Sequence, residues 1–493
     1  MKTVAEGWFM SQRPGWQLPL GLMLGAFIAL LDVSIVTVAL PDIGSDLNTG
    51  TSGMQWVVDA YTLPLSALLL AGGVLGDRCG RKRTYLTGIV VFTLASLGCA
   101  LAPSVGALIA ARAVQGAAAA LVFTGTLSNL AQAYPEPRER ARIIGLNGAV
   151  GGSAIVIGPL LGGVLVDSVG WRSIFLINLP VGLLILWLGA RSLPETSDPD
   201  HAHLDLTGQV LALVLLGTLT YGLIESHAHG WASAHTVAPL FTAFAALVLF
   251  IWWERRSPRP MLPVRLFRDR GFTVPNVCSF VLGFGTSAVF FLLSLYLQQV
   301  QGRSAIQTGL RFLPLTLSIC AVAPVASTLC AKFGAIRVMV VGYLVSAAGL
   351  AGLLLLDVDT GLGTLAVVSV VLGAGMGAAI GPTQLAGVAA LPVRQSGLAA
   401  ATISTTRQVG TALGVAVLGL IVATSAGAGP GTEGFADGFV RGLHISAAVT
   451  AASTLAAAVL LTPLARRTRP AVIPAHARQS ADQSLGMKER REG

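Results

Sequence analysis

Long apolar blocks are the feature of this sequence that most restricts its fold. Fourteen blocks of about 20 residues follow one another along the 493-residue chain, and about 20 apolar residues form a helix that crosses a hydrocarbon core of roughly 30 Å. Because lipid offers no hydrogen bonds to an irregular backbone, each block is predicted to be a membrane-spanning helix. The sequence therefore predicts an all-α polytopic membrane protein. The predicted spans are residues 18–40, 54–75, 84–102, 106–131, 141–166, 173–193, 206–225, 236–253, 272–297, 307–330, 335–356, 362–387, 397–424 and 439–463.

The charge composition excludes a soluble protein. Only 11% of the residues are charged, whereas soluble domains carry about 25%. The net charge of +9 does not indicate a nucleic-acid partner, because the basic residues lie in short clusters between apolar blocks, as they do in cytoplasmic loops. The five cysteines are odd in number and lie in or beside the spans, so no disulfide framework is expected.

The distribution of basic residues predicts the orientation of the chain. If both termini are cytoplasmic, 26 of the 32 Lys and Arg residues fall in internal tails and loops and four fall on the external side. The other two, Arg112 and Arg407, lie inside spans. Cytoplasmic loops carry such an excess of basic residues. We therefore expect a multi-pass protein of a bacterial inner (plasma) membrane with both termini in the cytoplasm; the bacterial origin is suggested by the Arg-, Ala- and Gly-rich composition.

A polar connection in mid-chain separates two groups of spans. Residues 254–270 read ERRSPRPMLPVRLFRDR, and the short runs 77–83 and 331–337, which follow the second and tenth spans, each have Gly at the fourth position. Such paired halves are expected in secondary transporters, with the site between them. The predicted organisation is a six-helix bundle at 1–205, an inserted helix pair at 206–254, a cytoplasmic linker at 255–271, a second six-helix bundle at 272–463 and a disordered cytoplasmic tail at 464–493.

The connection after the second span carries the most extended motif. Residues 73–85 read GVLGDRCGRKRTY, in which glycines allow a tight turn and Asp77 can pair with neighbouring cations. This run resembles the cytoplasmic loop motif of the major facilitator superfamily and departs from it only at Tyr85. The alternative is a charged anchor that only fixes topology, although an anchor requires neither the Asp nor the glycines. The resemblance implies a gating loop formed by Gly73, Asp77, Arg78, Gly80, Arg81 and Lys82.

The fourth span contains a buried charge. Arg112 and Gln115 stand in the run LxxxRxxQGxAAA, and an Arg at this depth costs about 2.5–3.5 kcal/mol on insertion scales, so it should face the interior of the bundle. The run is similar to the fourth-span motif that the same superfamily uses in proton coupling. The alternative is a structural Arg that joins two helices, and both roles can coexist.

The fifth span is rich in glycine at helical spacing. Two pairs of glycines lie four residues apart, which gives flat faces for close helix contact, and a proline interrupts the backbone hydrogen bonds. The run GPxxGG, placed one loop after the fourth-span motif, resembles the signature of the antiporter branches of the superfamily. The residues concerned are Gly148, Gly152, Gly158, Pro159, Gly162 and Gly163.

The first span contains an acid. Its run LDVSIVTVALPDI resembles the first-span motif of the fourteen-span drug–proton antiporter branch, with Thr37 in place of the Asn that is common there. Burial of a carboxyl group favours its protonated form, so Asp32 is a candidate proton carrier. The alternative is a buried Asp that only hydrogen-bonds to a neighbour.

Two further charges inside spans have open roles. Asp59 lies in the second span and Arg407 in the thirteenth, and a structural role is as plausible as a functional one for each. Histidines at 227, 229 and 235 do not form a recognised metal-binding motif, so we expect no metal site. A nucleotide-binding motif and a nucleophile–base constellation are both lacking, so we expect neither a cofactor nor an enzyme.

These resemblances cover nearly the whole chain and imply the major facilitator fold, with two six-helix halves, a two-helix insertion and alternating access. The implied function is a proton-coupled antiporter that exports small amphipathic molecules such as drugs, antibiotics or secreted metabolites. Its expected partners are membrane lipid, protons and a small-molecule substrate, and we expect a monomer. The alternatives are a dedicated transporter that takes up or exports one small solute and, less favoured, a non-transporting membrane sensor. Proton coupling is assigned to Asp32 and Arg112, and the substrate cavity to Asp32, Asp59, Gln115 and Arg407.

Overall fold

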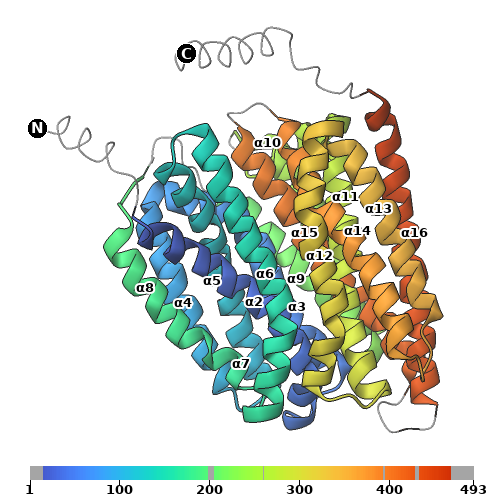
Figure 1. Cartoon of the computed structure of the whole chain (residues 1–493). Coiled ribbons are helices and arrows are strands. Elements are labelled where there is room, and N and C mark those ends of the chain that lie inside the picture. Colours follow the sequence, from blue (N-terminus) through green and yellow to red (C-terminus); the bar gives the residue numbers. More distant parts are fainter. Residues whose placement is uncertain are drawn as a thin grey trace, which may run out of the picture.

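The computed structural model of the chain describes residues 15–197, 205–258, 260–391, 395–427, 432 and 434–467, and these residues are largely helical (Figure 1). Within them, fourteen helical segments are long and apolar enough to cross a membrane, one in each predicted block. The prediction of an all-α chain with fourteen spans is therefore confirmed. Most of the predicted tail, from residue 468 onward, lies outside the described residues.

The first six spans form the N-terminal bundle, the blue to green helices of Figure 1. Within this bundle α3 packs on α5, α2 on α6, and α4 on both α5 and α8. The short α7 and α8 together make the sixth span. The bounds are α2 (Gln17–Asp46), α3 (Thr51–Cys79), α4 (Arg81–Ala100), α5 (Val105–Ala133), α6 (Pro137–Val169), α7 (Ser173–Leu176) and α8 (Asn178–Ser192).

The last six spans form the C-terminal bundle, the yellow to red helices of Figure 1. Here α12 packs on α14, α11 on α15, and α13 on both α14 and α16, so each pairing has its counterpart at the same position in the N-terminal bundle. The bounds are η1 (Val264–Arg268), α11 (Arg270–Leu295), η2 (Tyr296–Val300), α12 (Ala305–Phe333), α13 (Ala335–Gly352), η3 (Leu353–Leu355), α14 (Leu362–Ala389), α15 (Ser396–Ala426) and α16 (Phe435–Arg467).

The inserted pair, α9 (Leu206–His229) and α10 (Ala234–Arg256), lies against both bundles. Its two helices pack on each other, and α9 also contacts α3 and α15. The Gln209 amide donates to the Ala67 carbonyl at 2.5 Å, and Leu216 is buried in one cluster with Ala67 and Ala412. The pair therefore covers the line along which α3 and α15 meet.

Two glycines at equivalent positions mark one end of the molecule, which we call the Gly80 end. Gly80 joins α3 to α4 with φ +101°, and Gly334 joins α12 to α13 with φ +86°. These backbone angles are readily adopted only by glycine. We call the opposite end, where Asn48 joins α2 to α3, the Asn48 end. On the predicted orientation, the Gly80 end is cytoplasmic.

Contacts between the two bundles gather toward the Asn48 end. The Ser294 hydroxyl of α11 donates to the Thr37 carbonyl of α2 at 2.7 Å, and the Gln55 amide of α3 donates to the Val415 carbonyl of α15 at 2.9 Å. Helices α6 and α12 also meet at this end, where Gly163 lies against Ala305. Toward the Gly80 end of α6, by contrast, a methyl group built on Gly148 would meet no atom within 4 Å. The structure is thus closed between the bundles at the Asn48 end.

Candidate functional site

The buried carboxylate of Asp32 is the centre of a polar network inside the N-terminal bundle. Its side chain on α2 is fully buried and forms an ion pair with the Arg112 guanidinium of α5. The Gln115 amide donates to Asp32 Oδ1 at 2.9 Å, and the Asn178 amide of α8 donates to the same oxygen at 3.1 Å. Helix α2 therefore carries the carboxylate, and α5 and α8 supply its hydrogen-bond donors.

Arg112 is almost as completely buried as Asp32. Its side chain is 1% exposed, and besides Asp32 it donates to the Val57 carbonyl at 3.1 Å and to Gln115 Oε1 at 2.8 Å. The guanidinium also lies 4.3 Å from the centre of the Tyr61 ring, where a cation is stabilised by the ring electrons. The expectation that this Arg faces the bundle interior agrees with its position.

Ser96 and Asn178 belong to the network, although neither was among the predicted site residues. Ser96 Oγ of α4 accepts from the Gln115 amide at 2.8 Å and from the Asn178 amide at 3.2 Å, and both side chains are buried. An amide within the sixth apolar block was a visible signal for Asn178. A single serine in an apolar helix carries no comparable signal.

The two charges of the network neutralise each other. The Asp32 carboxylate is held by the Arg112 guanidinium in a fully buried ion pair. Removing either charge of a buried pair leaves the other unpaired at a cost of about 3–5 kcal/mol. The ion pair and the amide hydrogen bonds to Asp32 therefore join α2 to α5 and α8.

Asp59 lies outside this network. Its carboxyl on α3 is fully buried, and Oδ1 accepts from the Thr62 hydroxyl at 3.4 Å. Among the residues that the structure describes, none donates a hydrogen bond to Oδ2. Helical spacing places Asp59 between Gln55 and Leu63 on the side of α3 that faces α15. The second acid predicted for the site is therefore near the line where the two bundles meet.

Arg407 belongs to the C-terminal bundle, on α15. Its backbone carbonyl is in tight contact with Gly283 of α11, and the residue is half-buried. Within the part of the chain that the structure describes, its guanidinium has neither a hydrogen-bond acceptor nor an ion-pair partner. Of the four residues predicted for the cavity, the structure thus brings only Asp32 and Gln115 into contact.

The predicted gating loop is a helix end and a turn. Asp77 lies in the last turn of α3 and binds Arg81, whose Nε is 2.8 Å from Oδ1. Arg81 Nη1 in turn donates to Gln132 Oε1 of α5 at 2.6 Å, and Lys82 Nζ donates to the Ala190 carbonyl of α8 at 2.8 Å. Gly73 has open space beside it, Gly80 takes the positive φ of the turn and Arg78 is exposed. All these contacts stay within the N-terminal bundle.

The glycines of α6 fall into three groups by what they face. Gly158 and Gly162 lie against α2, where a methyl group on Gly162 would be 2.9 Å from the Ile35 carbonyl oxygen. Gly163 faces α12, and the Pro159 carbonyl oxygen is in close contact with Gly309 of the same helix. Gly148 and Gly152 have no atom within 4 Å of a built methyl group.

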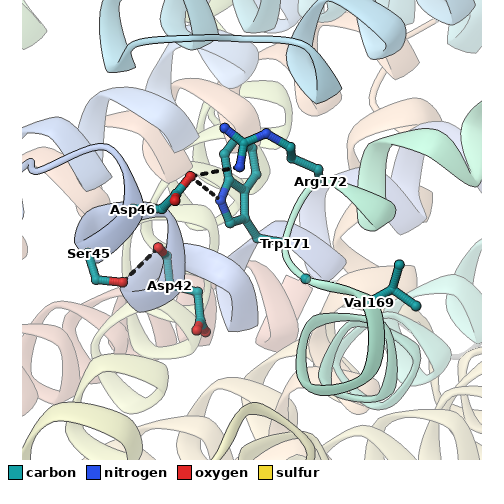
Figure 2. Close-up of a pocket in the computed structure, with 7 residues that line it drawn as sticks. Asp42, Ser45, Asp46, Val169, Trp171 and Arg172 are labelled. Carbon is teal, nitrogen blue, oxygen red and sulfur yellow. Dashed lines mark hydrogen bonds and ion pairs between the residues drawn. The ribbon is translucent and has the colours of Figure 1, made fainter.

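A cavity of about 410 Å³ lies at the Asn48 end, away from Asp32 (Figure 2). Figure 2 shows the Asp46 carboxylate bound by both Trp171 and Arg172, with donor distances of 3.0 and 2.7 Å. Of the two acids in this pocket, Asp46 is thus already paired within its own bundle. The lining residues are Asp42, Ser45, Asp46, Val169, Gly170, Trp171 and Arg172.

Known proteins resemble this chain in sequence and in fold. The sequence profile of the Major Facilitator Superfamily matches residues 22–415. The multidrug resistance protein Stp of Mycobacterium tuberculosis is 37% identical over 401 residues, which are 81% of this chain and 74% of that protein. The cephamycin export protein CmcT of Amycolatopsis lactamdurans is 37% identical over 462 residues, 91% of this chain and 92% of that protein. The tetracenomycin C resistance and export protein of Streptomyces glaucescens is 34% identical over 426 residues, 86% and 78% of the two chains.

Two solved structures share the fold at low sequence identity. One is a bacterial homologue of the human lysosomal transporter Spinster in an inward-facing, unoccupied conformation, with a TM-score of 0.64, 18% identity, and coverage of 91% of this chain and 96% of that one. The other is a D-xylose–proton symporter, with a TM-score of 0.63, 14% identity, and coverage of 90% and 97%. The expected fold is confirmed by these likenesses.

Proposed function

The chain belongs to the Major Facilitator Superfamily and is a multi-pass membrane transporter, not an enzyme; from that premise we propose that it exports small amphipathic molecules in exchange for protons. Export is supported by the names of its relatives, which include resistance and export proteins for several antibiotics. Proton exchange is supported by one observation above the others, the fully buried ion pair between Asp32 and Arg112.

In the proposed mechanism, the charge of Asp32 couples proton movement to the change in conformation. In the conformation described here, Asp32 is fully buried and bound by Arg112, so it takes up a proton from the Asn48 end only after the bundles rearrange. Opening at the Asn48 end admits a proton, which neutralises Asp32 and releases Arg112 from the ion pair. Return to the present conformation requires the carboxylate to lose that proton toward the Gly80 end. The gradient thus drives the cycle in one direction.

Substrate contacts are proposed for the remaining charged and polar residues of the interior. Gln115 is occupied by Asp32 and Ser96 in this conformation, so it becomes available only when the network rearranges. Arg407 has neither a hydrogen-bond acceptor nor an ion-pair partner for its guanidinium within the described residues, so this group can bind a substrate once the bundles open around it. Asp59, with one carboxyl oxygen that has no hydrogen-bond partner in the described part of the chain, is a second group that we propose binds a proton or a substrate.

The proposal is tested by proton-driven uptake into inverted membrane vesicles. A fluorescent amphipathic dye should accumulate when the vesicle interior is acidified and should leave when a protonophore collapses the gradient. A matched vesicle preparation without the protein provides the background. Equal accumulation with and without the gradient would exclude proton coupling but leave export open.

The proposed orientation predicts opposite results for two reporter fusions. The segment between α9 and α10 should be external, so a reporter that is active only outside the cytoplasm should work at Gly230. The same reporter should be inactive at Ala475, which lies outside the described residues, because the excess of basic residues places the C-terminal tail inside. A cytoplasmic signal at Gly230 would contradict the fourteen-span topology.

Asp77→Asn tests the proposed gate at the Gly80 end. We expect normal expression and a transport rate lowered roughly tenfold, because the charge that orders the α3–α4 turn through Arg81 is lost. Initial rates of dye uptake in the vesicle assay give the measurement, and Cys79→Ser, at an exposed neighbouring position outside the assigned gating residues, is the control. A normal rate for Asp77→Asn would leave this turn as a topological anchor only.

A further inference from the structure

A carboxylate of one bundle binds the start of a helix of the other. Asp167, near the end of α6, accepts from the Ser304 hydroxyl at 2.8 Å and from the backbone N–H groups of Ala305 and Ile306 at 3.2 and 3.0 Å. The latter two residues begin α12. The positive end of a helix dipole lies at this position and favours a negative charge.

Helix α12 does not need Asp167 in order to form. Ser304 is already its N-cap, and the Ser304 hydroxyl accepts from the Gln307 N–H at 3.4 Å. Asp167 is exposed, so water can replace it at the free N–H groups of the first turn. The carboxylate therefore adds a contact between the bundles rather than a contact on which the folding of α12 depends.

The contact lies at the rim of a close helix–helix approach. One turn before Asp167, a methyl group on Gly163 would be 2.5 Å from the Ala305 carbonyl oxygen, and one turn further the Pro159 carbonyl touches Gly309. Glycine lets the two backbones meet along this line, which we call the α6–α12 seam. Asp167 adds the charge-assisted bonds at the end of the seam that faces water.

We propose that Asp167 is the latch that holds the Asn48 end closed. This rests on the proposed function in one respect, since alternating access requires the α6–α12 seam to open once in every cycle. Asp167 is thus a positioning residue that sets the ratio of the closed to the open conformation. Asp46, a carboxylate at the same end, cannot do this, because its partners Trp171 and Arg172 belong to its own bundle.

The test measures the distance between the bundles at the Asn48 end. Nitroxide labels are placed at the exposed positions Ser45 and Asp359, one on each bundle, after the five native cysteines have been replaced. Double electron–electron resonance on the purified full-length chain, without substrate or gradient, then gives the populations of short and long distances. Three variants are compared with the parent, namely Asp167→Ala, Asp167→Glu and Asp46→Ala.

Asp167→Ala should raise the ratio of long to short distances roughly 5- to 30-fold, the change expected for loss of one charged cap. Asp167→Glu should restore most of the short distance, and Asp46→Ala should leave the parent ratio unchanged. An unchanged ratio in Asp167→Ala, or an equal shift in Asp46→Ala, would overturn the latch. Because no gradient or substrate is present, this result is independent of whether export is coupled to protons.

Discussion

Asp32→Asn is expected to abolish gradient-driven export, reducing dye uptake to the level seen with a protonophore. Asparagine has nearly the shape of aspartate and can still accept from Gln115 and Asn178, but it cannot bind and release a proton in this pH range. In the variant, position 32 therefore has no carboxylate for which a proton and Arg112 can compete. Uptake into inverted vesicles, compared between the variant and the unmodified protein, is the measurement.

A change in stability must be separated from the loss of coupling. Asp32→Asn leaves Arg112 buried and unpaired, which costs about 3–5 kcal/mol, so the variant could lose transport by unfolding. The double variant Asp32→Asn/Arg112→Gln removes both charges and should regain most of the thermal stability without regaining transport. Asp46→Asn, which removes a carboxylate from the Asn48 end, should transport normally. Undiminished gradient-dependent uptake by Asp32→Asn would show that Asp32 is not the coupling residue and would point to Asp59 or another residue.

The spans were predictable because the bilayer imposes them. A block of about 20 apolar residues has only one way to satisfy its backbone in lipid, and every predicted span is a helix in the structure. The ends were less predictable. The second span was expected to stop at residue 75, but α3 continues to Cys79, because helical hydrogen bonds do not depend on hydropathy and persist until the backbone of Gly80 turns away. Asp77 is therefore on a helix and not in a loop.

The side that each residue faces was less predictable than its depth. Lipid and the bundle interior are both apolar, so a spanning helix is hydrophobic all round and its pattern does not show which side turns inward. Asp32 and Arg112 could be placed in an interior because charges avoid lipid, but their direct pairing could not. For the same reason the sequence grouped Asp59 and Arg407 with Asp32, whereas the structure gives neither a contact with it.

The role of the α6 glycines shows the same limit. Their spacing predicted close helix contacts, but it could not say that Gly158 and Gly162 face α2 within the bundle while Gly163 faces α12 across the seam. The two contacts behave differently in the proposed cycle. The contact with α2 lies within one bundle and persists, whereas the contact with α12 must form and break. The difference can be tested with one substitution at two positions of a single helix.

Gly163→Ala is expected to reduce transport roughly ten- to a hundredfold, whereas Gly148→Ala should leave it unchanged. The added methyl group at Gly163 would lie 2.5 Å from the Ala305 carbonyl oxygen and 2.6 Å from Ile306 Cα. Both are backbone atoms, so no side-chain rotation relieves the overlap, and overpacking of this kind costs about 1–3 kcal/mol. That cost falls only on the conformation closed at the Asn48 end, so the variant should fold but close rarely.

The matched glycine isolates this effect from helix propensity. Gly148 lies on the same helix with no atom within 4 Å of a built methyl group, and alanine favours a helix over glycine by about 1 kcal/mol at either position. Initial rates of dye uptake and thermal unfolding are measured for both variants, together with Gly309→Ala, which crowds the same seam from α12. We expect Gly163→Ala and Gly309→Ala to lose transport while keeping their unfolding temperatures. Equal rates in all three variants would mean that tight closure of the α6–α12 seam is not a step of the transport cycle.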